Sequence, residues 1–147
     1  MGTDKVEDLT IRPYQDSDED AVVSLWREAF PNASARNDPR MNIRMKLAFQ
    51  PELLFVALKD GELVGTVMAG YEGHRGWANF AAVRKKLRRS GIGVALMKHA
   101  EQELRKIGCI KLNLQVRKTN AEVIRFYETL GYNVEEIVNM GKTLVDE

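Results

Sequence analysis

Residues 88–93 read Arg-Arg-Ser-Gly-Ile-Gly, and they combine three features that suit a phosphate group. Gly91 and Gly93 leave the backbone bare, and a stretch with helical apolar periodicity follows them directly. The first amides of a helix have no acceptor within it, and the helix dipole adds partial positive charge, so such an end binds phosphate readily. Arg88 and Arg89 can add charge-assisted hydrogen bonds. The segment therefore predicts a phosphate-binding helix start.

Two well-known phosphate motifs do not fit this segment. A Walker loop requires Gly-Lys-Ser/Thr, which is absent, and a dinucleotide fingerprint requires a small residue where Leu96 stands. The acidic residue expected about 20 positions later in that fingerprint is also missing. The remaining interpretation is a loop at a helix start that binds a pyrophosphate and belongs to neither of those two classes. The alternative is a glycine-bearing loop with a solvated basic face, since 84–89 carries five basic residues in six.

Together with a second motif, this loop resembles the GCN5-related N-acetyltransferase (GNAT) family. The family pattern at the helix start is present as Arg88-x-x-Gly91-x-Gly93. The second motif, an Asn followed by an aromatic pair and Gly-aromatic, is present in NAEVIRFYETLGY (120–132). The stretches GTVMAGYEGHRG (65–76) and NDP (37–39) look especially like small bacterial members. The resemblance covers essentially the whole chain.

The resemblance implies acetyl-CoA as the acyl donor. Backbone amides from 88 to 94 would bind the coenzyme A pyrophosphate, and the strand ending at Val83 would pair with the pantetheine arm. The amide of Val83 would be a candidate donor to the thioester oxygen, where one such donor can lower the barrier by several kcal/mol. The implied coenzyme residues are Ala81, Val83, Arg88, Arg89, Ser90, Gly91, Ile92, Gly93, Val94, Asn120 and Tyr127.

Asn120 and Tyr127 are seven residues apart, which is two helical turns, so they project to one face of a helix. The resemblance assigns Asn120 to the pantetheine chain and Tyr127 to protonation of the departing thiolate. A phenol with a pKa of about 10 can give a proton to a thiolate whose parent thiol has a pKa near 8.5. The alternatives are a core aromatic for Tyr127 and a plain helix cap for Asn120.

The acceptor is expected to be a primary amine that attacks directly in a ternary complex, and its general base is less clear. The strand at 77–83 contains no carboxylate, so the usual place for a Glu is empty. Glu72 could act through water, and His74 is an alternative, although EGHRG also fits a plain polar turn. Trp26, Asn37 and Tyr71 are the candidate acceptor contacts.

The composition bounds the class of protein. The chain has 147 residues and a net charge of +1, which fits one domain over 1–147 and gives no overall field for nucleic acid. No stretch approaches the roughly 18 apolar residues of a membrane span, and the acidic, polar N-terminus does not resemble a signal peptide. We expect a cytoplasmic protein that binds neither nucleic acid nor membrane. The single cysteine, Cys109, fits a buried structural thiol, and no His/Cys cluster suggests a metal.

The elements that must position these residues follow the order β-α-α-β-β-β-α-β-α-β-β. This order predicts an α/β (α+β) domain with a mixed, twisted sheet of about six to seven strands flanked by about four helices. A parallel strand–helix–strand unit should contain the glycine loop, and a final hairpin could support a homodimer. A non-catalytic acyl-CoA-binding or sensor module is the main alternative function. The expected strands are 9–14, 53–59, 62–71, 77–83, 109–116, 132–138 and 141–145, and the expected helices begin at 16 or 17, 39, about 92 and 120.

Overall fold

The computed structural model describes residues 8–145. Residues 1–7, on which the expectation about a signal peptide depends, lie outside the described residues. The chain divides into two compact units, 1–115 and 116–147. The larger unit contains the sheet, and the described part of the smaller unit contains one α-helix. The expectation of a single domain stays a prediction.

Within residues 8–115 there are five strands and three α-helices, joined by loops that include short 3₁₀ turns. The strands are β1 (Leu9–Pro13), β2 (Leu54–Lys59), β3 (Glu62–Tyr71), β4 (Gly76–Val83) and β5 (Leu112–Leu114). The helices are α1 (Glu19–Ala29), α2 (Pro39–Leu47) and α3 (Ile92–Lys106). Most of these elements confirm the expected order and differ from the expected bounds by only a few residues at each end.

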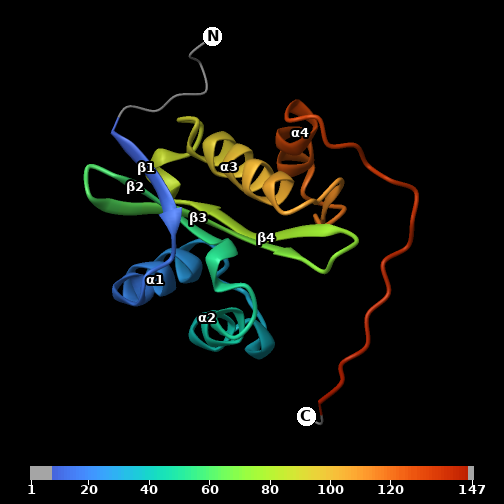
Figure 1. The fold of residues 1–147 in the computed structure, drawn as a ribbon, viewed down its shortest axis with the longest axis horizontal. Helices are drawn as coiled ribbons and strands as arrows, with labels where there is room; N and C mark the ends of the chain where they lie inside the picture. The colour runs from blue at the N-terminus through green and yellow to red at the C-terminus, as the bar shows by residue number, and fades with distance from the viewer. Residues whose placement is uncertain (1–7, 146–147) are drawn as a thin grey trace. The chain divides into compact units, whose positions relative to one another are not determined.

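The five strands form one mixed sheet in the order β1-β2-β3-β4-β5 (Figure 1). The first three junctions are antiparallel, and β4 pairs with β5 in parallel. The hairpin between β2 and β3 turns at Asp60-Gly61, as the sequence predicts, because this dipeptide accepts the positive φ angles of a tight turn. Helix α3 provides the crossover between the two parallel strands, which confirms the predicted strand–helix–strand unit.

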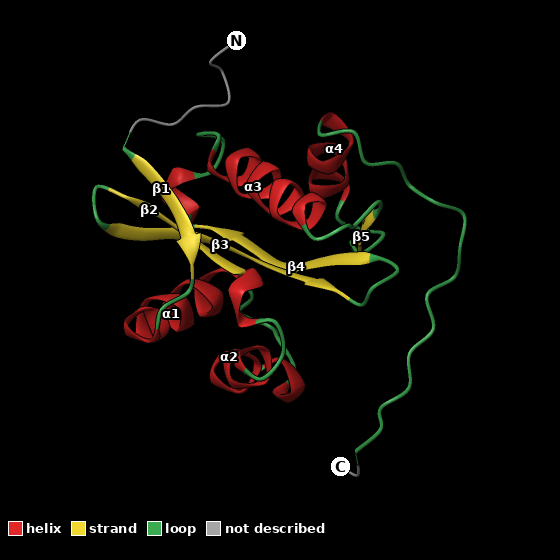
Figure 2. Ribbon diagram, in the orientation of Figure 1, coloured by secondary structure: helices red, strands yellow, loops and turns green. Residues whose placement is uncertain are grey.

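The helices of this unit cover both faces of the sheet (Figure 2). Helices α1 and α2 pack on one face, where Trp26, Ile43 and Val56 belong to a single buried cluster. Helix α3 packs on the other face through buried apolar residues spaced at three and four positions, as an amphipathic helix requires. Those residues are Ile92, Leu96, Met97, Ala100 and Leu104.

Helix α1 begins at Glu19, slightly later than the expected start at 16 or 17. A 3₁₀ turn at Asp16–Asp18 precedes it, and the amide of Gln15 donates to the Asp18 carboxylate over 2.8 Å. Arg12 also donates to Asp18 over 2.8 Å. Burial alone would raise the pKa of Asp18, but these hydrogen bonds outweigh it and lower the pKa below its usual value. The cap therefore uses a residue held by tertiary contact from β1, which local spacing cannot predict.

Helix α2 begins as the sequence predicts. The Asp38 carboxylate accepts a hydrogen bond from the Met41 amide over 3.1 Å, and Pro39 occupies the first helical position. This pairing satisfies one of the first-turn amides and presets the backbone of the first turn. Asp38 is therefore a helix cap.

The smaller unit contains helix α4 (Ala121–Thr129), which Asn120 precedes and Gly131 follows. No strand is formed at 132–145, so the predicted hairpin of 132–138 and 141–145 is wrong, and the sheet has five strands instead of six or seven. A two-stranded hairpin is only marginally stable in water without further packing, and Ile137, Val138 and Met140 are 78%, 86% and 89% exposed. The surface expected to support a homodimer is therefore not formed as a hairpin.

Candidate functional site

The glycine loop forms an uncapped helix start. Gly91 has φ +91° at the position before α3, a left-handed conformation that only glycine adopts without strain. The first helical hydrogen bond runs from the Ala95 amide to the Gly91 carbonyl over 3.0 Å, so the amides of 92–94 have no acceptor within the helix. The Ser90 hydroxyl donates to the Leu87 carbonyl and does not cap the helix. The amides that the sequence assigns to a phosphate therefore lie at the open end of α3.

The basic run before this loop is partly balanced by acidic side chains. The Lys85 amide donates to the Glu28 carboxylate over 2.7 Å, and Lys86 lies 3.9 Å from Glu62. The hydrogen bond from the Lys85 amide is the main cause that lowers the pKa of Glu28. Arg88 and Arg89, closer to the helix start, are exposed. Arg88 also interacts electrostatically with Glu28, so this acidic side chain offsets part of the charge next to the loop.

Strand β4 has an open edge beside this loop. It pairs with β3 along its length, but β5 pairs with it only at 76–78. Among residues 8–115, no strand pairs with 79–83 on that side. The Arg84 amide donates to the Val64 carbonyl of β3 over 2.8 Å. Because successive strand residues direct their amides to opposite sides, Val83 directs its amide to the open edge.

A β-bulge interrupts β4 at the same place. The register with β3 shifts between the pairs Thr66↔Ala82 and Met68↔Asn79, and Phe80 has φ +48°. A positive φ in a bulky residue is unfavourable, so surrounding contacts must hold it. The bulge changes which way the backbone between Asn79 and Ala82 faces, next to the open edge.

A buried hydrogen-bond chain holds this bulge. The Trp26 indole Nε1 donates to the Thr66 hydroxyl over 2.8 Å, and that hydroxyl donates to the Phe80 carbonyl over 2.9 Å. The Trp26 and Phe80 rings stack with centroids 4.2 Å apart. Trp26 is 1% exposed and Thr66 is 0% exposed. Trp26, expected as an acceptor contact, is therefore a core residue that supports β4.

Sequence reasoning did not identify Thr66 as part of the site. It is a buried hydroxyl within an otherwise apolar strand, and such a group requires hydrogen-bond partners. The sequence therefore indicates that Thr66 needs partners. It does not indicate which, because Trp26 and Phe80 lie 40 and 14 residues away along the chain. Only the tertiary structure identifies them.

The structure does not bring the three expected acceptor contacts together. Asn37 is exposed in the loop between α1 and α2. The Tyr71 hydroxyl lies within hydrogen-bond distance of the carbonyls of Gly73 and Gly108, at 3.1 and 3.3 Å. Since Gly108 lies two residues after the end of α3, this phenol lies on the face that α3 covers, opposite to the one that Trp26 occupies.

Glu72 lies in the exposed turn between β3 and β4, where its amide donates to the Arg75 carbonyl over 3.3 Å. The pair Tyr71↔Gly76 closes this turn. Gly76 and Phe80 are four residues apart, which is roughly 13 Å at a strand rise of 3.3 Å per residue. Glu72 is therefore too far along the strand to take a proton directly at the bulge.

In the smaller unit, Asn120 and Tyr127 are both fixed by local contacts. The Asn120 side chain accepts from the Val123 amide over 3.3 Å, which confirms it as a helix cap. The Tyr127 ring lies edge-on to Phe126 and Tyr132, with centroids 5.1 and 5.7 Å apart. Burial raises the pKa of the Tyr127 phenol, so the group stays protonated at neutral pH.

Three other expectations from the sequence can be compared with the structure. Cys109 is buried, 9% exposed, and packs against Gly76, which confirms a structural thiol. Among residues 8–145, no group of three or more His, Cys, Asp or Glu side chains is placed to hold a metal ion. None of the helices within that range combines the length and apolar character needed to cross a membrane.

Comparison with known proteins agrees with this architecture. The model of the "Acetyltransferase (GNAT) family" matches residues 19–132. An acetyltransferase of Pectobacterium atrosepticum is 40% identical over 139 residues, covering 95% of this chain and 98% of that protein. The chain therefore belongs to the GNAT acetyltransferase family, and the names of its relatives support an acyltransferase.

Two solved structures have the same fold. The ribosomal-protein-S18-alanine N-acetyltransferase from Escherichia coli superimposes with a TM-score of 0.70 and 26% identity, covering 85% of this chain and 77% of that chain. AAC(6')-Iy, solved with the bisubstrate analogue CoA-S-monomethyl-acetylneamine, superimposes with a TM-score of 0.77 and 16% identity. That alignment covers 93% of this chain and 99% of the other.

Proposed function

We propose that this protein transfers an acetyl group from acetyl-CoA to a primary amine, which attacks the thioester directly. The observation that carries this proposal is the open edge of β4. The basic loop connects the end of this strand to the uncapped start of α3. An extended, amide-bearing arm that ends in a pyrophosphate matches that surface. Relatives named acetyltransferases and a neighbour solved with a coenzyme A bisubstrate analogue support the same ligand.

The pyrophosphate is proposed to bind at the start of α3. The amides of Ile92, Gly93 and Val94 have no acceptor within the helix, and the helix dipole favours an anion there. The amides from Arg88 to Gly91 complete the loop, and the two arginine side chains can form charge-assisted hydrogen bonds. The bare backbone at the glycines lets the phosphate oxygens approach these amides.

The pantetheine arm is proposed to lie along the open edge of β4, in the manner of an added strand. Val83 directs its amide to this edge, and Ala81, within the bulge, is the second residue proposed to pair with the arm. The amide of Val83 is also the proposed donor to the thioester oxygen, where negative charge develops during attack. The bulge held by Thr66 sets the direction of this backbone.

Asn120 and Tyr127 are proposed to complete the coenzyme site. The Asn120 side chain, which also caps α4, would hydrogen-bond the pantetheine chain. Tyr127 is the proposed general acid that protonates the departing thiolate. Its raised pKa keeps the proton on the phenol at neutral pH, so the phenol is present as a proton donor.

The general base is proposed to be Glu72 acting through water. A distance of roughly 13 Å along the strand excludes direct transfer at the bulge, but a water chain from the turn can bridge it. His74, exposed in the same turn, is the alternative base. Asn37 remains a proposed acceptor contact at the loop between α1 and α2.

A non-catalytic acyl-CoA-binding module is the second candidate function. The specific observation in its favour is that β4 carries no carboxylate and that the nearest proposed base lies beyond the strand end. Such a module would bind acetyl-CoA at the same loop and strand edge without releasing its thiol.

A thermal shift followed by a thiol-release screen distinguishes these functions. Acetyl-CoA at about 100 times its dissociation constant should stabilise the fold by roughly 2.7 kcal/mol. Release of the thiol in the presence of an amine, with formation of its acetamide, would establish transfer. Stabilisation without thiol release across a broad amine panel would support the binding module, and no stabilisation would contradict both functions.

A further inference from the structure

The carboxylate of Glu28 contacts the backbone of the loop that joins β4 to α3. Its Oε2 accepts a hydrogen bond from the Lys85 amide over 2.7 Å, a short distance that is typical of a charged acceptor. The two residues are 57 positions apart in the chain. Glu28 lies in the last turn of α1, which packs on the face of the sheet opposite to α3 (Figure 2). The contact therefore connects the loop before α3 to a helix that lies outside the proposed coenzyme site.

The Lys85 amide is the first amide of a 3₁₀ turn. The turn spans Lys85–Leu87, and Arg84 before it provides no side-chain cap. The first amides of a helical turn have no acceptor within it, so Glu28 caps this turn from another element. The last amide of the turn donates to the Arg84 carbonyl over 2.8 Å, and the Arg88 amide donates to the Lys85 carbonyl over 3.4 Å. Holding Lys85 therefore also holds the point at which the glycine loop begins.

The strand side of this loop is held by different contacts. The Arg84 amide donates to the Val64 carbonyl of β3 over 2.8 Å. Its guanidinium also lies against α1, 3.4 Å from the Ser24 hydroxyl. These contacts fix the chain directly after Val83 without the Lys85 amide. Glu28 therefore acts on the side of the loop that leads to the proposed pyrophosphate site.

The charge of Glu28 is unfavourable for a pyrophosphate that binds close by. Arg84, Arg88 and Lys85 all attract this carboxylate, so it competes with an anionic ligand for the same cations. A carboxylate beside an anion site can favour binding only through geometry. Here the geometric contribution is the acceptor oxygen that it offers to the Lys85 amide.

Glu62 provides a comparison within the same cavity. Glu28 and Glu62 both line a surface cavity of about 470 Å³, together with Arg84, Lys85 and Lys86. The Glu62 carboxylate lies 3.9 Å from the Lys86 Nζ, so it faces an ammonium instead of a backbone amide. The two residues bring the same charge to the same basic segment, and of the two it is Glu28 that bonds to the loop backbone.

We propose that Glu28 is a positioning residue for coenzyme binding. Its carboxylate oxygen caps the 3₁₀ turn and thereby holds the backbone of 88–94 in the conformation that receives the pyrophosphate. It acts through the Lys85 amide and not by contact with the coenzyme. The inference rests on the acetyl-CoA site proposed above and adds a residue that lies outside it.

Substitutions at Glu28 separate the acceptor oxygen from the charge. Glu28→Gln keeps the length and an acceptor oxygen but loses the charge, whereas Glu28→Asp keeps the charge and withdraws the carboxylate by about 1.5 Å, one carbon–carbon bond. Calorimetry should give a dissociation constant for acetyl-CoA that is about three- to tenfold higher in Glu28→Ala and Glu28→Asp, the effect of losing one hydrogen bond. Glu28→Gln should bind within about twofold of the unmodified protein. Glu62→Ala is the matched control and should also stay within about twofold, because an exposed ion pair contributes little.

The amide resonance of Lys85 reports the contact itself. A short hydrogen bond to a carboxylate moves an amide proton downfield, so in ¹⁵N-labelled protein this resonance should move upfield in Glu28→Ala and Glu28→Asp and less in Glu28→Gln. Melting temperatures of the variants should stay close to that of the unmodified protein, because Glu28 is exposed and lines a surface cavity. A role limited to stability would change melting temperatures without this pattern of affinities.

The outcomes separate this inference from the proposed function. If Glu28→Ala or Glu28→Asp bound acetyl-CoA as tightly as the unmodified protein, the positioning role would be overturned. Equal weakening in Glu28→Gln or in Glu62→Ala would overturn it as well, because the loss would then follow the charge and not the backbone contact. Absence of acetyl-CoA binding to the unmodified protein would instead contradict the proposed function, and the positioning role with it.

Discussion

At the scale of single residues, the proposed chemistry depends on where protons are held. Burial raises the pKa of the Tyr127 phenol, so the phenol is protonated at neutral pH and cannot act as a base there. Because the parent thiol of the departing thiolate has a pKa near 8.5, the phenolate left after proton transfer is the stronger base and takes up a proton again afterwards. Tyr127 is therefore suited to the acid role and not to deprotonation of the acceptor.

Replacing Tyr127 with Phe should remove the acid and keep the ring contacts with Phe126 and Tyr132. We expect kcat for acetyl transfer to fall by about 10²-fold or more, while the dissociation constant of acetyl-CoA changes little. Steady-state kinetics with calorimetry of coenzyme binding measure the two effects separately. A variant that turns over at the parental rate, with chemistry limiting, would remove Tyr127 from the acid role.

Thr66 is expected to link fold stability to coenzyme binding. Thr66→Val keeps the shape but leaves the Trp26 indole without an acceptor and the Phe80 carbonyl without its donor, so unfolding free energy should fall by about 1–3 kcal/mol. Coenzyme affinity should fall as well, because the bulge directs the edge amides. Thr66→Ser should largely restore both. Urea unfolding and calorimetry provide the measurements, and a Thr66→Val variant as stable as its parent would disprove the role.

At the scale of elements, the site depends on how closely α3 approaches the sheet. Gly65 of β3 lies under the first turns of this helix, and a Cβ atom there would lie 2.8 Å from Leu96 and 3.3 Å from Ile92 side-chain atoms. The same atom would lie 3.1 Å from the Ala82 carbonyl of β4. One glycine therefore sets the position of the helix start relative to the open strand.

Gly65→Ala should displace the start of α3. We expect a loss of about 1–3 kcal/mol in unfolding free energy, the usual cost of overpacking, together with weaker coenzyme binding. Gly61→Ala, in the β2–β3 turn with no atom within 4 Å of its Cβ position, is a control that carries only backbone strain. If Gly65→Ala lost stability but bound coenzyme as tightly as Gly61→Ala, the coupling between packing and binding would be refuted.

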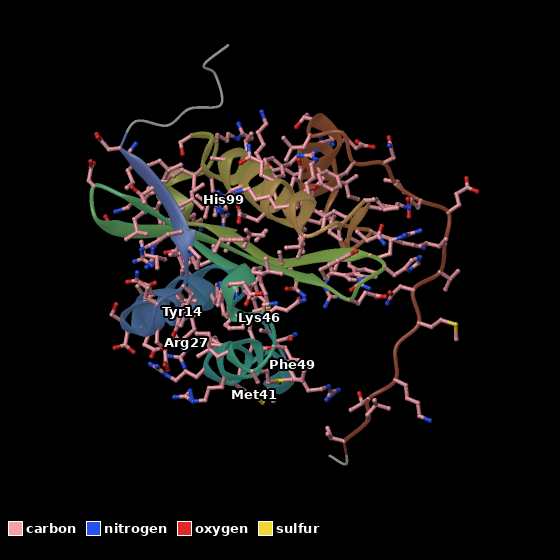
Figure 3. All side chains as sticks on the ribbon, viewed as in Figure 1. Tyr14, Arg27, Met41, Lys46, Phe49 and His99 are labelled. Carbon is pink, nitrogen blue, oxygen red and sulfur yellow. The ribbon has the colours of Figure 1, made fainter. Side chains whose placement is uncertain are left out.

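Helix α3 also carries a pH-dependent contribution to stability. His99 contacts Phe55 edge-on at 4.7 Å and is partly buried, and burial lowers its pKa below the usual value despite the nearby Glu103 (Figure 3). The unfolded chain therefore takes up a proton at His99 at a higher pH than the folded chain does. Stability should fall as the pH drops below about 6.5, and His99→Gln should flatten this part of the profile. Melting temperatures between about pH 7.5 and 5 test this, and identical slopes for both proteins would contradict it.

Most helices and strands can be predicted from the sequence, because a few neighbouring residues determine where each begins and ends. The Asp60-Gly61 turn, the Asp38-Pro39 helix start and the apolar period of α3 each depend on a few neighbouring residues. The bulge at Phe80 could not be predicted, since Trp26 and Thr66 hold it from distant positions. Apolar residues at 134–145 resemble strand residues, but a strand also requires a pairing edge, and no ladder forms there.

Among the candidate site residues, the coenzyme loop is the part that local sequence determines best. A glycine that requires φ +91° and a helix that begins beside it are encoded together. Acceptor contacts depend on which faces and loops meet in three dimensions. The sequence analysis names both Trp26 and Tyr71 as candidate acceptor contacts. The structure places them on opposite faces of the sheet.

At the scale of the whole molecule, charge is distributed in a way that fits an anionic cofactor. The net charge is only +1, yet the segment from 84 to 89 contains five basic side chains beside the start of α3. Glu28 and Glu62 interact with part of this run, at Lys85 and Lys86. A near-neutral protein with a local basic segment of this kind is suited to a small polyanion more than to a nucleic acid.

The binding of coenzyme A at the helix start is the central claim, and amide chemical shifts test it most directly. Titrating coenzyme A into ¹⁵N-labelled protein should move the amide resonances of residues 88–94 first and furthest, followed by those of Ala81 and Val83 on the open edge of β4. Shifts confined to other residues, or no shifts at millimolar coenzyme, would contradict the account.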